Sequence, residues 1–134
     1  MEIKCVFLII EDNQIDQFIT TQLLKKIVDE PEINIANNGK EGINWISHNR
    51  KENDVPLIIL LDIQMPIMNG LQFLAEYDKL EEELKRETQI FMLSSSLDDN
   101  EIICLKDNVY VTDFLNKPLC VKDFCKRIYS SIHE

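Results

Sequence analysis

The sequence lacks a long apolar segment, a paired-cysteine motif and an excess of positive charge. Its longest apolar run is far shorter than the ~20 residues that a membrane-spanning helix needs. The four cysteines form no Cys-x-x-Cys pair and have no zinc-ligand spacing, which is typical of free thiols in a reducing compartment. A net charge of −10 argues against binding to nucleic acid or anionic lipid. We therefore expect a cytoplasmic protein with no nucleic-acid or membrane partner.

Signal peptides, internal repeats, low-complexity stretches and interdomain linkers are also missing. The 134 residues are enough for one hydrophobic core, and an apolar content of 45% is ordinary for a globular protein. Met1 runs almost directly into a strand-like segment, and only one helical segment follows Lys117-Pro118. These features predict that residues 1–134 form one domain that acts alone, with no output domain.

The chain does contain a regular alternation of short apolar runs and longer amphipathic stretches. Runs of strand length occupy residues 5–10, 33–36, 57–61, 90–93 and 113–115. A helical pattern follows each run: the first has an apolar stripe of Ile15, Ile19, Leu23 and Ile27, the second has Ile43 and Ile46 on one face, and the others span about residues 70–84, 100–107 and 121–132. Asp12 or Asn13 can cap the first helix.

This alternation indicates an α/β fold. Strands that alternate with helices form parallel sheets, and near-continuous apolar strands are expected where helices cover both faces of the sheet. We predict a flavodoxin-like (βα)5 fold, which is a doubly wound parallel sheet of five strands in the order 2-1-3-4-5.

Polar residues follow four of the predicted strands. They are Glu11 and Asp12 after the first strand, Asp62 after the third, Ser94 after the fourth and Lys117 after the fifth. Right-handed crossovers bring these strand ends to one edge of the sheet, where open α/β sheets bind ligands. Converging carboxylates repel one another unless a cation compensates, and hard oxygen ligands favour Mg²⁺. We therefore predict a Mg²⁺ site where Asp62 is the nucleophile toward a phosphoryl group, with Lys117 and Ser94 on the phosphoryl oxygens.

Together these residues resemble the receiver domain of two-component response regulators. The resemblance spans essentially the whole chain and is carried by four segments in order: Phe7-Leu8-Ile9-Ile10-Glu11-Asp12-Asn13, Leu61-Asp62-Ile63-Gln64-Met65-Pro66-Ile67-Met68-Asn69-Gly70, Met92-Leu93-Ser94-Ser95 and Phe114-Leu115-Asn116-Lys117-Pro118. It implies that a sensor histidine kinase or a histidine phosphotransfer protein phosphorylates Asp62. It also implies Mg²⁺ held by Glu11 (through water), Asp12, Asp62 and the Gln64 carbonyl.

The resemblance further implies a switch and two positions that set the lifetime of the phosphorylated state. Phe114 falls at an aromatic switch position, where the ring turns inward as Ser94 moves toward the phosphoryl group. Gln64 and Ser96 border the path of the hydrolytic water. The chain is thus expected to be a signalling phosphoacceptor rather than an enzyme, although it promotes its own phosphorylation and dephosphorylation. An unidentified downstream protein, or a second copy in a phosphorylation-dependent dimer, would recognise the changed surface.

Three other functions are compatible with this fold. A phosphatase or mutase with an aspartyl nucleophile usually has a second acid two residues later, where Gln64 stands here, and a cap domain. A degenerate receiver that binds partners without phosphorylation is disfavoured by the intact Asp12, Asp62, Ser94 and Lys117. A flavin-binding module is disfavoured because acids after the first strand would repel a phosphate tail.

Overall fold

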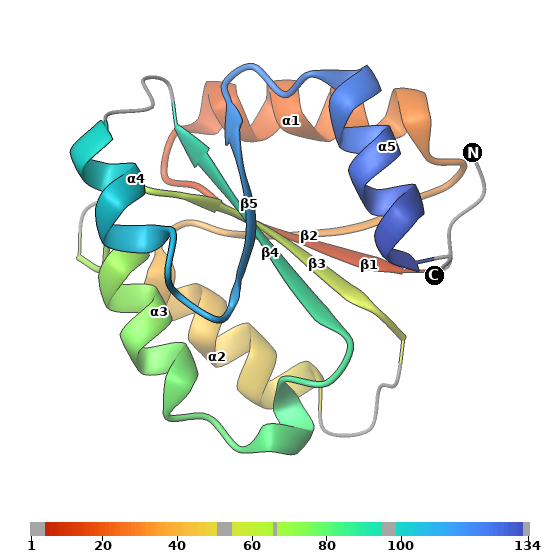
Figure 1. Cartoon of the computed structure of the whole chain (residues 1–134). Coiled ribbons are helices and arrows are strands. Elements are labelled where there is room, and N and C mark those ends of the chain that lie inside the picture. Colours follow the sequence, from red (N-terminus) through yellow and green to blue (C-terminus); the bar gives the residue numbers. More distant parts are fainter. Residues whose placement is uncertain (1–4, 51–54, 66, 95–98, 133–134) are drawn as a thin grey trace.

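Five parallel strands form the central sheet, in the spatial order β2-β1-β3-β4-β5 (Figure 1). The computed structural model describes residues 5–50, 55–65, 67–94 and 99–132. The strands are β1 (Val6–Ile10), β2 (Glu32–Ala36), β3 (Leu57–Asp62), β4 (Thr88–Ser94) and β5 (Val111–Asn116). The predicted fold and strand order are confirmed, and β4 and β5 each begin two residues earlier than predicted.

Helices cover both faces of this sheet. Figure 1 shows α1 (Gln14–Ile27) and α5 (Val121–Ile132) on one face and α2 (Gly39–Asn49) and α3 (Gly70–Asp78) on the other. The short helix α4 (Asp99–Leu105) packs Leu105 into the core on the side of α2 and α3. Within the described ranges, no helix is both long enough and apolar enough to cross a membrane.

The third predicted helix is shorter than the prediction of residues 70–84. Helix α3 ends at Asp78, and a separate 3₁₀ turn, η1, spans Glu82–Leu84. Leu80 and Leu84 still face the core, so the apolar spacing continues beyond the point where the backbone leaves the helix. Glu81 has an extended conformation between the two elements, and the periodicity alone does not predict this break.

Helix α1 buries a different face from the predicted one. Its buried residues are Gln17, Thr20, Leu24 and Ile27. Of the predicted stripe only Ile27 is buried, while Ile15 is 70% exposed and Ile19 39% exposed. The reason is the Gln17 amide, which donates hydrogen bonds to the Glu11 carbonyl and to Asn37 Oδ1 and turns the polar side of the first two turns inward. Phe18 is therefore also on the surface, 64% exposed.

The two apolar cores lie on opposite faces of β1, β3 and β4. Successive residues of these strands alternate between the cores, which is why the strands are continuous apolar runs. Gly70 fixes where α3 begins relative to β3, because a Cβ there would lie 3.1 Å from Ile63 Cα and 3.3 Å from the Asp62 carbonyl oxygen. Close packing of the helix start against the strand end holds Asp62 at the edge of the sheet.

Candidate functional site

A cavity of about 200 Å³ lies at the carboxyl edge of the sheet. Its lining residues are Glu11, Asp12, Asn13, Asp16, Asp62, Gln64, Ser94 and Lys117. The structure thus brings together all six residues that the sequence nominated for phosphoryl transfer and Mg²⁺ binding. Asn13 and Asp16 were not among the predicted site residues.

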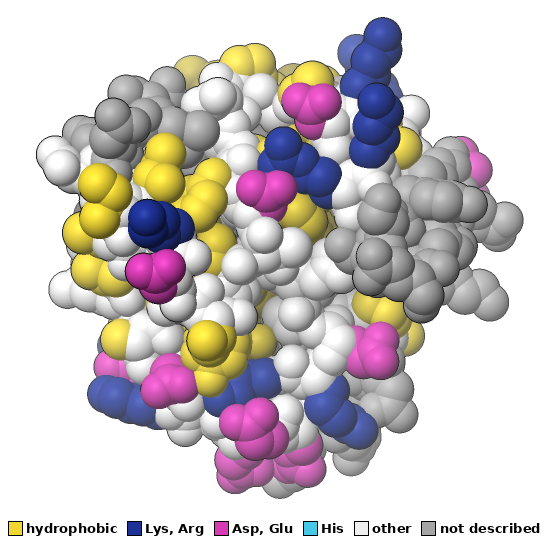
Figure 2. Space-filling view, viewed as in Figure 1, with side chains coloured by type: hydrophobic (Ala, Val, Ile, Leu, Met, Phe, Trp, Pro, Cys, Tyr) yellow, Lys and Arg dark blue, Asp and Glu magenta, His cyan; other side chains and the backbone are white. Residues whose placement is uncertain are grey.

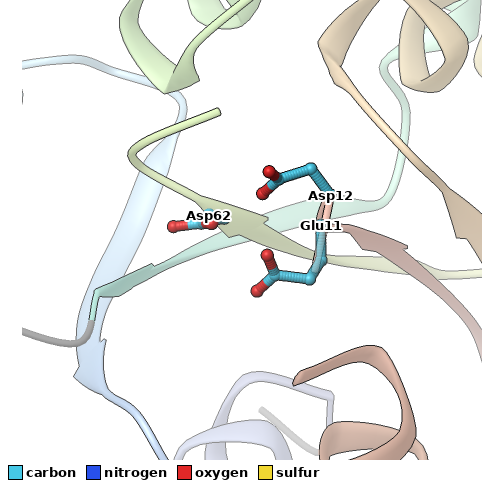
Figure 3. A group of neighbouring side chains, drawn as sticks. All are labelled: Glu11, Asp12 and Asp62. Carbon is cyan, nitrogen blue, oxygen red and sulfur yellow. The ribbon is translucent and has the colours of Figure 1, made fainter. Parts of the chain in front are cut away.

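Three carboxylates converge in this cavity. Glu11 follows β1 and Asp62 ends β3, and the pairing of Ile10 with Leu61 makes these two acids neighbours across adjacent strands. One oxygen each from Glu11, Asp12 and Asp62 lie within 4.8 Å of one another (Figure 3). Glu11 and Asp62 are buried, whereas Asp12 is exposed. A cluster of carboxylate oxygens with one side open to water fits a hard cation such as Mg²⁺, which keeps several water ligands.

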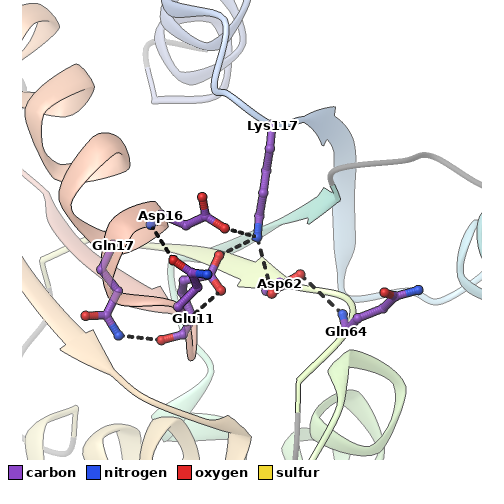
Figure 4. A network of polar contacts seen from close by, with 7 residues as sticks. Glu11, Asp16, Gln17, Asp62, Gln64 and Lys117 are labelled. Atoms are coloured by element: carbon purple, nitrogen blue, oxygen red, sulfur yellow. Dashed lines mark hydrogen bonds and ion pairs between the residues drawn. The ribbon is translucent and has the colours of Figure 1, made fainter.

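The Lys117 ammonium lies among these acids. Its Nζ is 2.5 Å from Glu11 Oε1, 3.1 Å from Asp16 Oδ2 and 3.3 Å from Asp62 Oδ2 (Figure 4). The Lys117 backbone N–H donates to the Ser94 carbonyl at 2.8 Å, which ties the end of β5 to the end of β4. Burial alone would lower the pKa of Lys117, but the Glu11, Asp62 and Asp16 carboxylates raise it well above its usual range, so the side chain stays charged.

Glu11 is fixed from several directions. Its Oε2 accepts a hydrogen bond from the Asn13 N–H at 3.2 Å, and its carbonyl accepts one from Gln17 Nε2 at 2.5 Å. The pKa of Glu11 is raised to about 7. Burial and the nearby Asp62 carboxylate raise it, and together they outweigh the hydrogen bond from Lys117, which lowers it. The carboxyl group therefore changes protonation near neutral pH.

Asp62 is held with both carboxylate oxygens engaged. Oδ2 faces Lys117, and Oδ1 accepts a hydrogen bond from the Gln64 N–H at 3.2 Å. The Gln64 side chain is exposed and extends away from Asp62 (Figure 4). Ser94, the last residue of β4, is buried in the cavity wall. The arrangement presents a fixed carboxylate beside an ammonium, a hydroxyl and three further acids, which suits metal-assisted phosphoryl transfer to Asp62.

A sequence model of the response regulator receiver domain matches residues 7–129 of the chain. The chain belongs to the response regulator receiver domain family. The resemblance predicted from the four segments is confirmed, and with it the assignment to two-component signalling, whose receiver domains are phosphoacceptors.

Relatives with this domain differ in size and architecture. The chain is 32% identical over 116 residues to hybrid signal transduction histidine kinase G of Dictyostelium discoideum, a match that covers 87% of the chain and 3% of the kinase. It is 26% identical over 125 residues to response regulator Rcp1 of Synechocystis sp., which covers 92% of the chain and 83% of Rcp1. The chain thus spans a very small part of the first relative and most of the second.

Solved structures have the same fold as this receiver domain. A two component response regulator from Cytophaga hutchinsonii aligns with a TM-score of 0.87 at 25% identity, covering 98% of this chain and 99% of the other. A response regulator receiver protein from Dyadobacter fermentans aligns with a TM-score of 0.83 at 28% identity, covering 95% and 97% of the two chains. Both alignments extend over nearly the full length of each protein.

Two predicted residues lie away from the cavity or beyond the described structure. Phe114, on β5, is half-buried and packs against the core on the α3 side of the sheet rather than lining the cavity. Ser96 lies outside the described residues. The switch and lifetime roles of these residues stay predictions.

Asp16 and Gln17 contribute to the site but escaped the sequence prediction. Both lie in the first turn of α1, which starts at the cavity edge and has Asn13 as its N-cap. The sequence did contain an indication of their role, because Asp16 and Gln17 are a polar pair about one helical turn after Asp12. Residues four apart lie on the same side of a helix. The apolar stripe of α1 led the interpretation to a different face of the helix, which shares only Ile27 with the buried one.

The protonation of Glu11 predicts a pH dependence of stability. The folded receiver holds this proton more tightly than the unfolded chain, because the folded pKa is about 7 against an ordinary 4.5. The stabilisation from this group is complete below about pH 4.5 and is lost as pH rises through 7. Relative to Glu11→Gln, the free energy of unfolding of wild type should fall by about 1–3 kcal/mol between pH 5 and pH 8 without divalent cations.

Urea denaturation of both proteins at several pH values in EDTA measures this difference. The variant Glu83→Gln, at an exposed position of η1, is the control and should follow wild type at every pH. Parallel curves for wild type and Glu11→Gln would contradict the raised pKa of Glu11.

Proposed function

We propose that this receiver domain is the phosphoacceptor of a two-component phosphorelay and accepts its phosphoryl group on Asp62. The donor is the phosphohistidine of a sensor histidine kinase or a histidine phosphotransfer protein. A carboxylate oxygen of Asp62 forms a bond to phosphorus while the P–N bond breaks and the imidazole takes up a proton. The observation that supports this role is the Asp62 carboxylate held in one cavity with three other acids, the Ser94 hydroxyl and the Lys117 ammonium.

The cation and the polar side chains have complementary roles in this proposal. Glu11, Asp12, Asp62 and the Gln64 carbonyl would hold Mg²⁺, directly or through water, and the ion would neutralise charge on the transferring oxygens. The cavity needs this charge, because it has four carboxylates and Lys117 is the only cationic side chain among its described lining residues. Lys117 and Ser94 donate hydrogen bonds to the other phosphoryl oxygens.

The output of the proposed switch is the surface formed by α4, β5 and α5. Ser94 is joined to the end of β5 by the Lys117 N–H, and Arg127 of α5 contacts β5 through Asp113 Oδ2 at 2.6 Å and the Phe114 carbonyl at 3.2 Å. A shift of Ser94 and Phe114 therefore has a direct path to α5. Figure 2 shows hydrophobic side chains over α4, where Ile103 is exposed. A downstream protein, or a second copy of the domain, would bind there.

The remaining proposals concern the lifetime of the phosphorylated state and the cellular location of the domain. Gln64, exposed at the cavity mouth, and Ser96 would govern the access of hydrolytic water and so the rate at which the domain dephosphorylates itself. The domain would act in the cytoplasm, and its output would be a change in binding to another protein.

The phosphoryl donor is proposed to dock on the exposed apolar side of α1. Ile15, Phe18 and Ile19 are solvent-exposed there, and the adjacent Asp16 lines the cavity. With a purified histidine kinase that phosphorylates wild type, we expect Phe18→Ser to reduce transfer about tenfold, because a large apolar contact is lost. The ratio of kinase-dependent to acetyl-phosphate-dependent phosphorylation measures this effect. An equal ratio in wild type and variant would place the docking surface elsewhere.

Intact mass spectrometry after incubation with acetyl phosphate tests the proposed function. Wild type should gain one phosphoryl group in Mg²⁺ and none in EDTA. If no mass is added although Mg²⁺ binds, and rapid sampling excludes a short-lived adduct, the domain is a phosphorylation-independent binding module and the proposal fails.

A further inference from the structure

The Asp16 carboxylate contacts the Lys117 ammonium, in addition to the carboxylates of Glu11 and Asp62. An ammonium has three N–H donors and no acceptor. Among the residues that the structure describes, the carboxylates within 3.3 Å of Lys117 Nζ are those of Glu11, Asp16 and Asp62 (Figure 4). Two of the N–H groups donate hydrogen bonds to Glu11 and Asp16, and the ammonium forms an ion pair with Asp62. The group of closely spaced acids that suits a cation contains Asp62 and Glu11 but not Asp16, so the contact of Asp16 is with the lysine.

The three acceptors come from three different elements. Glu11 follows β1, Asp62 ends β3, and Asp16 is the third residue of α1. The first turn of α1 is firmly placed, because Asn13 Oδ1 accepts the Asp16 N–H at 3.0 Å and the Gln17 amide bonds to the Glu11 carbonyl. Asp16 therefore has a fixed position at the start of α1, whereas the Lys117 side chain that it contacts is a flexible four-carbon chain.

We propose that Asp16 is a positioning residue for phosphoryl transfer, which with Glu11 holds Lys117 Nζ so that its third N–H faces Asp62. This inference rests on the proposed function. When Asp62 becomes an acyl phosphate, its carboxylate charge is lost and the ion pair with Lys117 ends, so the remaining N–H of the ammonium can donate to a phosphoryl oxygen. Glu11 and Asp16 keep the other two donors, so the ammonium does not have to be repositioned during the reaction.

Phosphorylation kinetics of Asp16 variants test the proposal. At saturating Mg²⁺ and acetyl phosphate, we expect Asp16→Ala to lower the phosphorylation rate constant about threefold to tenfold, a modest factor because the Asp16 side chain is 35% exposed. Asp16→Asn, which keeps the shape and loses the charge, should fall between Ala and wild type. Asp16→Glu should restore most of the rate, because its carboxylate can still reach the ammonium.

A matched control separates this contact from a general effect of acids at helix starts. Asp123 is also the third residue of its helix, α5, and is exposed. Asp123→Asn should keep the wild-type rate. Urea midpoints for all variants show whether any rate change merely follows a loss of stability.

The outcomes are distinguishable from those of the proposed function. If wild type takes up no phosphate, the proposed function itself fails. If wild type is phosphorylated and Asp16→Ala matches it, Asp16 does not position the lysine. A faster Asp16→Ala shows that Asp16 competes with the phosphoryl group for Lys117, which also overturns the proposal. Equal losses in Ala, Asn and Glu variants that track lower urea midpoints would indicate a structural role instead.

Discussion

Asp62→Asn is expected to gain no phosphoryl group from acetyl phosphate in Mg²⁺, under conditions where wild type gains one. The amide that replaces the carboxylate is not a nucleophile toward phosphorus. The carboxylate that would attack is held in place, because Asp62 is paired with Lys117 through one oxygen and accepts the Gln64 N–H through the other. Intact mass spectrometry measures the presence or absence of the added phosphoryl group.

Two further measurements make this result specific. Asp107→Asn, at an exposed position after α4, is the matched control and should be phosphorylated like wild type. Asp62→Asn should stay folded in urea titrations, because it removes one negative charge from a crowded cavity. Phosphate uptake by Asp62→Asn, located by peptide mapping on Asp12 or Glu11, would show that the acceptor has been assigned to the wrong carboxylate.

The sheet and the residues gathered at its edge were predictable for one physical reason. Strands that are covered on both faces must be continuously apolar, so a polar residue directly after such a strand marks its end. In a parallel sheet all such ends meet at one edge. Asp62 after β3 and Ser94 at the end of β4 are examples, and the structure places both in one cavity.

The parts that escaped prediction depend on hydrogen bonds rather than on hydrophobic pattern. The buried face of α1 is set by the Gln17 amide, whose partners on Glu11 and Asn37 are known only once the fold has brought them together. The same rotation turns Asp16 toward Lys117 and leaves Ile15 on the surface. An apolar stripe shows which face of a helix can be buried. It does not exclude burial of a polar face whose side chains have hydrogen-bond partners.

Lys117→Met is expected to lose both phosphorylation and stability, in contrast to Asp62→Asn. Methionine keeps much of the length of the side chain but leaves Glu11, a buried acid, without its closest cation. Removing one partner of a buried ion pair costs about 3–5 kcal/mol. Because Glu11 can take up a proton and Lys117 lies partly open to solvent, we expect a loss of about 1–3 kcal/mol here.

The response of Lys117→Met to Mg²⁺ separates the two functions of the lysine. Without the ammonium, the cavity is more negative, so Mg²⁺ should bind more tightly and recover more of the free energy of unfolding than it adds to wild type. Phosphorylation should stay low even then, because no N–H remains to bond to the phosphoryl oxygen. Urea denaturation in EDTA and in Mg²⁺, together with intact mass, measures both effects.

Lys79→Met, which removes an exposed lysine paired with Glu76, is the control. Recovery of wild-type phosphorylation in Mg²⁺ would mean that Lys117 acts only by balancing charge, and that its contact with Asp62 has no part in phosphoryl transfer.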